Sequence, residues 1–347
     1  TATTLNYTGN QNLSHRNIII NGAMRIAQRA SSSTANGYGD LDRWKHEYAG
    51  TNENPTFAQV SLTTSDTPYT LGLTKAVKIT NGNQTSGLQA SSQINFNQQI
   101  EAQNIRNSGW NYKSSSSYIT LSFWVRSSVS QNFNGFVKTV DGTNYIYPYE
   151  TGTLSANTWT KITKSIPGNS NLQIDDDNGS GFQVFAIAIY GTNMTDNSVT
   201  YNQWAGWSSG GRSKDQANSW FTTNDATLEI TGVQLEAGPV ATPFEHRSDA
   251  DEMLRCKRYF QPYIQYAEYV SGGTGNLGFP YTAFTVPMRA SPTFTSDHES
   301  KSSNWSFHTM QVQGSDAYGY YAYAISYNTT NGNYGYMRKY GQASAEL

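Results

Sequence analysis

One segment, GWSSG at positions 206–210, has the glycine and serine spacing of a nucleophile elbow. That motif activates its serine only where a strand turns sharply into a helix and a histidine lies within reach. The residues that follow, GRSKDQANSW, are polar and have no helical period, which favours a chance match in a loop. A glycosidase would need two carboxylates at a defined separation, and the sequence pairs none. We therefore expect no catalytic residues and no enzymatic activity, with a glycan depolymerase as the remaining alternative.

Three consecutive carboxylates, Asp175, Asp176 and Asp177, begin the segment DDDNGSG. Calcium takes about six to eight oxygen ligands and tolerates loose geometry, so this density of carboxylates could hold it. The spacing does not match an EF-hand loop, and a solvated acidic turn has the same composition. These residues are candidate ligands of a structural calcium ion, with an acidic hairpin loop as the alternative. No other cofactor is indicated.

Three tryptophans, Trp204, Trp207 and Trp220, flank a glycine-rich polar stretch that also holds Arg212 and Asp215. Flat aromatic rings pack on the apolar C–H face of a sugar, while charged side chains can hydrogen-bond to its hydroxyls. These five residues are the candidate glycan-binding site. The competing interpretation is that some of the tryptophans are buried plugs at the end of a β-sandwich.

The elements that would position such a site are β-strands. Few residues are charged (14%) and many are aromatic (13%), which is typical of short strands joined by tight turns. YITLSFWVR (118–126) alternates apolar and polar residues, and FQVFAIAIY (182–190) is apolar on both faces. In ATLEITGVQLEAG (226–238) the apolar parity slips at Gly232, which predicts a β-bulge that keeps both halves on the core face.

The sequence thus predicts an all-β fold with a jelly-roll or β-sandwich domain, a short connecting helix and a smaller C-terminal β domain. The expected boundaries are residues 1–39 for an N-terminal arm and attachment segment, 40–245 for the sandwich, 246–260 for the helix and 261–347 for the C-terminal domain. Ser248 with Asp251 three residues later forms a capping-box-like helix start. A helix this short is marginal alone, so it must pack on its own domain or on other copies of the chain.

Tyrosines are concentrated near the C-terminus, in YYAYAISY (320–327) and YGYMRKY (334–340). The Asn331-Gly332 pair between them predicts a hairpin with a tyrosine-rich face, which could be a glycan platform or a seam between subunits. The single cysteine excludes an internal disulfide, so the fold must be held by packing and by partners. The candidate interface residues are Met253, Leu254, Phe260, Tyr321, Tyr323, Tyr334 and Tyr336.

Two classes of partner are disfavoured by composition. The formal net charge of −2 lacks the basic excess that binding to a nucleic-acid backbone needs. No apolar run approaches the roughly 20 residues that span a bilayer, so we expect neither nucleic-acid binding nor membrane insertion.

Several segments together resemble a set found in bacteriophage virion proteins, especially of marine phages. They are NIIINGAMRIAQRA (17–30), LDRW (41–44), LSFWVRSS (121–128), SIPG (165–168), LEITGVQLEAGPVATPFEHRS (228–248), DEMLRCKRYF (251–260) and FTVPMRASPTFT (284–295). They occur in the same order and span most of the chain.

The resemblance implies a jelly-roll module similar to carbohydrate-binding domains, a homotrimer, and a location on the virion surface beside other virion proteins. Such proteins are usually tail fibres that bind host surface polysaccharide. Only residues 1–16 precede the first shared segment, whereas a tail fibre has a long anchor and shaft. A capsid decoration or head-fibre protein with a purely structural role therefore remains an alternative.

Overall fold

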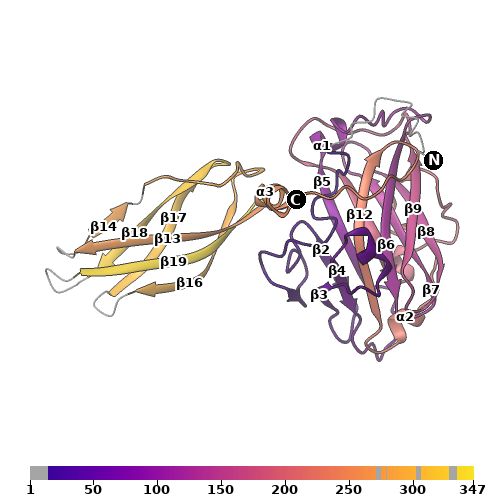
Figure 1. Ribbon diagram of the computed structural model, residues 1–347, viewed down its shortest axis with the longest axis horizontal. Coiled ribbons are helices and arrows are strands. Elements are labelled where there is room, and N and C mark those ends of the chain that lie inside the picture. The colour runs from indigo at the N-terminus through magenta and orange to yellow at the C-terminus, as the bar shows by residue number, and fades with distance from the viewer. Residues whose placement is uncertain (1–14, 271–274, 279, 302–305, 328–333) are drawn as a thin grey trace. The chain divides into compact units, whose positions relative to one another are not determined.

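The computed structural model describes residues 15–347, except 271–274, 279, 302–305 and 328–333. Contacts divide the chain into two compact units, one ending at Arg247 and one spanning Ser248–Glu346, with Leu347 counted in the first. Both units consist of antiparallel sheets (Figure 1), which confirms the predicted all-β class. None of the helices in the described residues is long and apolar enough to cross a membrane.

The first unit is a sandwich of two sheets. Sheet I has the order β1 (Ser32–Ser33), β3 (Thr56–Ser61), β4 (Lys75–Thr80), β12 (Thr227–Ala237), β6 (Tyr118–Ser127) and β9 (Thr160–Pro167). Sheet II has the order β11 (Ala205–Gly206), β8 (Tyr145–Leu154), β7 (Gln131–Thr139), β10 (Ser180–Tyr190), β5 (Gln93–Glu101) and β2 (Lys45–Ala49). The connections contain the short helices α1 (Ala102–Arg106), α2 (Ser219–Thr222), η1 (Thr67–Leu71) and η2 (Thr192–Met194).

The core lies between the two sheets and follows the predicted alternation. Four side chains of β6 are fully buried there: Ile119, Leu121, Phe123 and Val125. Because successive side chains of a strand point to opposite faces, Ser122 and Trp124 lie on the outer face of sheet I.

The predicted bulge in β12 is confirmed. The register of β12 against β6 shifts between Thr231 and Gln234, and Gly232 has a φ of 61°. Glycine adopts this left-handed conformation without the steric cost that a Cβ brings. The residues on both sides of the slip, Ile230 and Val233, are fully buried, so the bulge keeps both halves of the strand on the core.

The segment expected as an arm, residues 1–39, joins the sandwich wherever the structure describes it. Ile19 and Met24 are fully buried in the core. The Ile18 N–H donates to the Leu235 carbonyl at 2.9 Å, and the Val233 N–H donates to the Gly22 carbonyl at 2.9 Å. Burying the apolar side chains of this segment against β12 is more favourable in free energy than leaving them in solvent. Residues 1–14 lie outside the described part.

The second unit begins with the predicted helix, α3 (Asp249–Lys257). The Ser248 hydroxyl accepts a hydrogen bond from the Asp251 N–H at 3.1 Å, as the capping pattern predicts. Cys256 and the following Tyr259 are buried, and the Ala345 N–H donates to the Tyr259 carbonyl at 2.8 Å. The helix is therefore tied to the C-terminal strands of its own unit.

The remaining strands of the second unit form two sheets around a small shared core. One sheet has the order β13 (Phe260–Val270), β19 (Tyr334–Ser344) and β16 (Thr293–Lys301). In the other, β18 (Gly319–Tyr327) pairs with β14 (Gly275–Gly278), β15 (Thr282–Ala283) and β17 (Ser306–Ser315).

The predicted tyrosine hairpin is wrong, because β18 and β19 pair within different sheets. Tyr320 on β18 and Ala343 on β19 are both buried in one cluster with Tyr263. The two segments thus contribute to the core from separate sheets, and burial of their inward faces decides the pairing over the turn signal between them.

Candidate functional site

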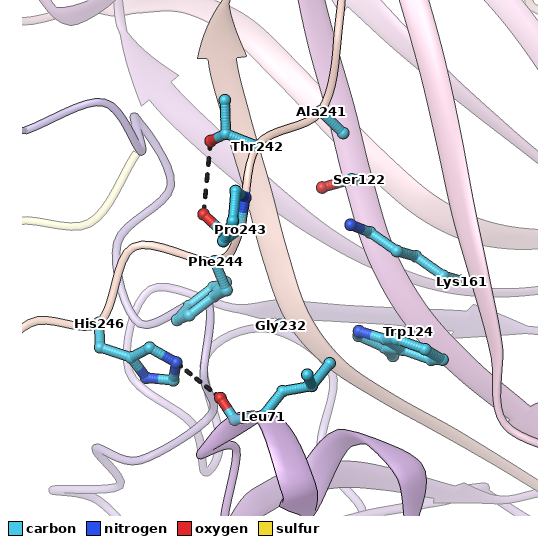
Figure 2. A pocket seen from close by; sticks show the side chains of 10 residues that line it. All are labelled: Leu71, Ser122, Trp124, Lys161, Gly232, Ala241, Thr242, Pro243, Phe244 and His246. Carbon is cyan, nitrogen blue, oxygen red and sulfur yellow. Dashed lines mark hydrogen bonds between the residues drawn. The ribbon is translucent and has the colours of Figure 1, made fainter. Parts of the chain in front are cut away.

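A pocket of about 550 Å³ opens on the outer face of sheet I. Figure 2 shows it between the strands β6 and β9 on one side and the segment that follows β12 on the other. The bulge residue Gly232 forms part of its floor, beside the Leu73 side chain, whose Cδ1 would lie 2.7 Å from a Cβ added there. The lining residues are Leu71, Ser122, Trp124, Lys161, Gly232, Ala241, Thr242, Pro243, Phe244 and His246.

Three side chains reach into the pocket from the strand side. Trp124 on β6 lies directly opposite Lys161 on β9, and Ser122 shares their face because it lies two residues before Trp124. In Figure 2 the lysine amine, the serine hydroxyl and the indole nitrogen all point toward the middle of the pocket. Ser122 is only 3% exposed, yet its hydroxyl has no hydrogen-bond partner among the described residues.

Trp124 differs from most tryptophans of the chain in its indole N–H. In the described residues, five other indoles donate to a backbone carbonyl or a carboxylate: those of Trp44, Trp110, Trp159, Trp204 and Trp220. The N–H groups of Trp124 and Trp207 have no such acceptor within the described part of the chain. A buried or half-buried indole usually finds a partner, so Trp124 offers a free donor at the pocket.

The opposite wall is the strap, which we define as residues 241–247. The Glu236 carboxylate accepts hydrogen bonds from the Thr242 N–H at 2.8 Å and the Thr242 hydroxyl at 2.6 Å. The Glu245 N–H donates to the Gln234 side chain at 2.8 Å, and the Glu245 carboxylate accepts from the Asn17 N–H at 2.8 Å. These bonds fix the strap to β12 and the N-terminal segment, so the pocket is formed before any ligand arrives.

The aromatic residues of the strap are fixed as well. Phe244 and Trp124 both pack against the apolar cluster that contains Leu73. The rings of Phe244 and His246 meet edge to face with centroids 5.1 Å apart. The His246 Nε2 donates to the Leu71 carbonyl at 2.8 Å, a role assigned because a carbonyl can only accept.

The carboxylates around the pocket already have partners. Burial acts to raise the pKa of Glu245, but hydrogen bonds to its carboxylate, led by that from the Asn17 N–H, lower it overall. Arg126, two residues beyond Trp124, forms ion pairs with Asp66 at 2.7 Å and with Glu229 at 2.5 Å. The acidic groups of this face therefore bond to other parts of the protein, and none of them lines the cavity.

The predicted residues Trp207 and Arg212 lie on the outer face of sheet II. An apolar cluster covers that face and consists of Phe136, Ile146, Phe185, Ala188 and Tyr190, with Met194 and Trp207 packed on it. The Lys138 ammonium lies 4.0 Å from the centroid of the Trp207 ring, and the Arg212 guanidinium lies 5.3 Å from it. Burial and the neighbouring Arg212 lower the pKa of Lys138. Trp207 and Arg212 do come together, but in a packed cluster and not in the lining of the pocket.

The other three predicted glycan contacts lie elsewhere. Trp220 is fully buried in the core, so the buried-plug interpretation holds for it. Trp204 is half-buried and meets Tyr147 edge to face, with ring centroids 5.4 Å apart. Asp215 is exposed and accepts hydrogen bonds from Thr195 and Asn197, which fastens a loop.

The acidic segment forms an exposed turn. Asp175, Asp176 and Asp177 are all exposed, and the Asp177 carboxylate accepts from the Gly179 N–H at 2.9 Å. Within the described residues, no group of three His, Cys, Asp or Glu side chains is arranged to hold a metal ion. The geometry fits the acidic-loop alternative and gives no support to the calcium site.

The GWSSG segment does not form a nucleophile elbow. Gly206 ends the two-residue strand β11, the exposed Ser208 and Ser209 follow in a loop, and the next helix begins only at Ser219. The strand-to-helix turn that the motif needs is missing at this position.

The candidate interface residues fall into three groups. Leu254 and Tyr321 are 43% and 46% exposed, and Met253 is half-buried. Phe260 is buried inside the second unit. Tyr323, Tyr334 and Tyr336 lie on described strands, but their side chains are outside the described part.

Sequence reasoning missed the pocket residues Trp124, Lys161 and Phe244. One signal was present, because the predicted alternation of β6 already placed Trp124 on the face away from the core. One outward aromatic residue does not by itself mark a binding surface, so this signal gained meaning only once the fold placed Phe244 beside it. The strap residues carried no comparable signal, since only the fold brings them beside β6.

No protein-family model and no curated protein matches the sequence. Among solved structures, the enzymatically active domain of tailspike protein 4 of bacteriophage CBA120 aligns with a TM-score of 0.34 and 10% identity, covering 64% of this chain and 21% of that chain. A putative sugar binding protein from Bacteroides thetaiotaomicron aligns with a TM-score of 0.35 and 12% identity, covering 64% and 100%. A family 11 carbohydrate-binding module from Clostridium thermocellum aligns with a TM-score of 0.27 and 9% identity, covering 56% and 88%. At these scores the likenesses carry no argument about function.

Proposed function

We propose that the sandwich is a glycan-binding module and that the pocket on sheet I is where it holds a sugar ring. The observation that carries this proposal is the pair of aromatic side chains, Trp124 from β6 and Phe244 from the strap, that line the same pocket. A sugar ring has apolar C–H faces and a fringe of hydroxyls, which suits an aromatic slot with a few polar groups at its edge. The volume lies within the range of about 300–1,000 Å³ that small-molecule sites occupy.

The proposed role is binding and not catalysis. The pocket lining contains no carboxylate, whereas glycoside hydrolysis needs two. Incubation of the protein with polysaccharide, followed by chromatography of the soluble fraction, tests this part. If oligosaccharides are released, the protein is a glycan depolymerase and not only a binding module.

We further propose that the chain belongs to a surface appendage of a bacteriophage virion, of the tail-fibre type. The resemblance of NIIINGAMRIAQRA and LEITGVQLEAGPVATPFEHRS to virion proteins supports this, and the bonds between Ile18 and Leu235 place these two segments side by side. Homotrimer formation through the exposed Leu254 and Tyr321 belongs to the same proposal. Light scattering at micromolar concentration should give a trimer for the native chain and a smaller species for Leu254→Asp, and a monomeric native chain would contradict it.

The binding proposal is tested with Trp124→Ala on a glycan array and by titration of any glycan that binds. Loss of one stacked aromatic should weaken binding by up to about tenfold, since such a contact contributes about 0.5–1.5 kcal/mol and about 1.4 kcal/mol is a factor of ten. Trp207→Ala on the other sheet is the matched control and should leave binding unchanged. If Trp207→Ala abolishes binding and Trp124→Ala does not, the site lies on sheet II. If no glycan binds at millimolar concentration, the structural role of a capsid decoration or head-fibre protein remains.

A further inference from the structure

The strand side of the pocket presents hydrogen-bond donors. The Lys161 ammonium and the Trp124 indole N–H can only donate, and the Ser122 hydroxyl can donate or accept. All three point toward the middle of the cavity (Figure 2), and none has a hydrogen-bond partner among the described residues. Ser122 is only 3% exposed as a residue, but its Oγ still reaches solvent at the pocket. The wall therefore suits a group rich in acceptors.

The charge of the pocket is also one-sided. Among the ten lining residues, all within the described part, Lys161 carries the one permanent charge, and no lining residue is acidic. Asp66 and Glu229 on this face are paired with Arg126, and the buried Glu236 carboxylate accepts hydrogen bonds from Thr242 and Gln234 behind the strap. The lysine charge at the pocket is thus left without a protein counter-ion.

We infer that the pocket takes a sugar residue that carries a negative charge, as a carboxylate or a sulfate. The ring lies between Trp124 and Phe244, and its anionic group meets the Lys161 ammonium together with the donors of Trp124 and Ser122. Hydrogen bonds between charged groups are about twice as strong as neutral ones, so the anion selects acidic sugars over neutral sugars of the same ring. This inference rests on the proposed function, because it assumes a sugar in the aromatic slot.

The test measures the affinity of the full chain for three methyl glycosides that share one ring: a uronic acid, the neutral hexose and the sulfated hexose. We expect the uronic acid or the sulfated hexose to bind about tenfold more tightly than the neutral sugar at low salt. The better of the two identifies the source of the charge. Salt should reduce the preference, because it screens an exposed ammonium.

Variants test the preference for acidic sugars separately from glycan binding itself. Lys161→Gln removes the charge but keeps a donor, and it should reduce the affinity for the acidic sugar to that for the neutral one while leaving the neutral sugar within about twofold. Lys113→Gln removes an exposed lysine outside the pocket and should change neither affinity. Trp124→Phe keeps an aromatic ring without its N–H and should weaken the acidic sugar more than the neutral one.

Three outcomes overturn the inference. Equal affinity for acidic and neutral sugars, with both lost in Trp124→Ala, would leave the glycan site in place and remove its acidic specificity. A preference for acidic sugars that survives in Lys161→Gln would move the anion to another group. If neither Trp124→Ala nor Lys161→Gln changes sugar binding, both the proposed site and its acidic specificity are wrong.

Discussion

The outer faces of the two sandwich sheets differ in what covers them. On sheet I, the strap follows β12 and faces Trp124 across the pocket, whose floor includes the bulge residue Gly232. On sheet II, the segment after β11 places Trp207 and Arg212 on the apolar cluster, and the Lys138 ammonium lies 4.0 Å from the centroid of the Trp207 ring. Both faces hold a tryptophan with a free N–H and a lysine, and the pocket described above opens on the first of them.

The difference shows that residue types alone do not specify a binding site on a β-sandwich. The sequence around Trp207 has more aromatic, basic and polar residues than the sequence around Trp124. Its side chains pack on one another, however, and their mutual contacts use the surfaces that a ligand would need. A glycine at a bulge and a hydrogen-bonded strap, neither of which has chemistry of its own, create the open site.

The largest expected effect separates the tryptophans by their roles. Trp220→Ala removes a fully buried indole and should lower the free energy of unfolding by about 3–5 kcal/mol, because a large cavity remains in the core. Trp124→Ala removes a half-buried ring and should cost less, about 1–2 kcal/mol. Urea unfolding monitored by fluorescence measures both.

If the two tryptophans have these different roles, one variant should lose mainly stability and the other mainly glycan binding. Trp220→Ala should retain glycan binding at temperatures where it is folded, whereas Trp124→Ala should remain folded and lose binding. Equal losses of stability would mean that Trp124 belongs to the core, and the sheet I pocket would then be a packing defect.

The second prediction concerns the floor of the pocket. Gly232→Ala adds a Cβ at a φ of 61°, where it would lie 2.7 Å from Leu73 Cδ1 and 3.4 Å from Trp124 Cδ1. Backbone strain and these close contacts should together cost about 1–3 kcal/mol, and the displaced ring should weaken binding. Gly152→Ala on sheet II is the matched control, because Gly152 has a φ of 76° and nothing lies within 4 Å of its added Cβ. If both variants lose the same stability and neither affects binding, the floor plays no part in the site.

Much of the fold could be predicted from the sequence, and little of the site. The alternation in β6 and the parity slip at Gly232 are local patterns, so they gave the sandwich strands and the bulge correctly. The tyrosine hairpin failed because β18 pairs with β17, which directly precedes it in the chain, while β19 pairs with β13 and β16. The pocket joins Leu71, Trp124 and Phe244, which are distant in sequence and share no local pattern.

The third prediction concerns the strap in acid. The pKa of Glu245 is lowered in the folded state, so its bonds stabilise the fold above the ordinary glutamate pKa and are lost as the pH falls through the lowered value. Glu245→Gln should cost about 1 kcal/mol near neutral pH, a modest value because the group is partly exposed. The difference from the native chain should shrink as the pH falls from about 6 to about 3. Asp176→Asn removes an exposed carboxylate and should leave the pH dependence unchanged, and a constant Glu245→Gln difference would contradict the argument.

The smallest expected effect tests the closed face of sheet II in alkali. Burial, and then repulsion by Arg212, lower the pKa of Lys138. Between this lowered value and the ordinary lysine pKa of about 10.4, the unfolded chain binds a proton that the folded chain has released, so the Lys138 contribution to stability rises with pH. As the pH rises from about 8 to about 10, the urea midpoint of the native chain should therefore rise relative to the midpoint of Lys138→Gln. Solvent screening of this half-buried group keeps the change small.

Lys113→Gln, which removes an exposed lysine, should show no such trend. A gap for Lys138→Gln that stays flat would mean that the ammonium on Trp207 is fully solvated and that the sheet II face is more open than its packing indicates.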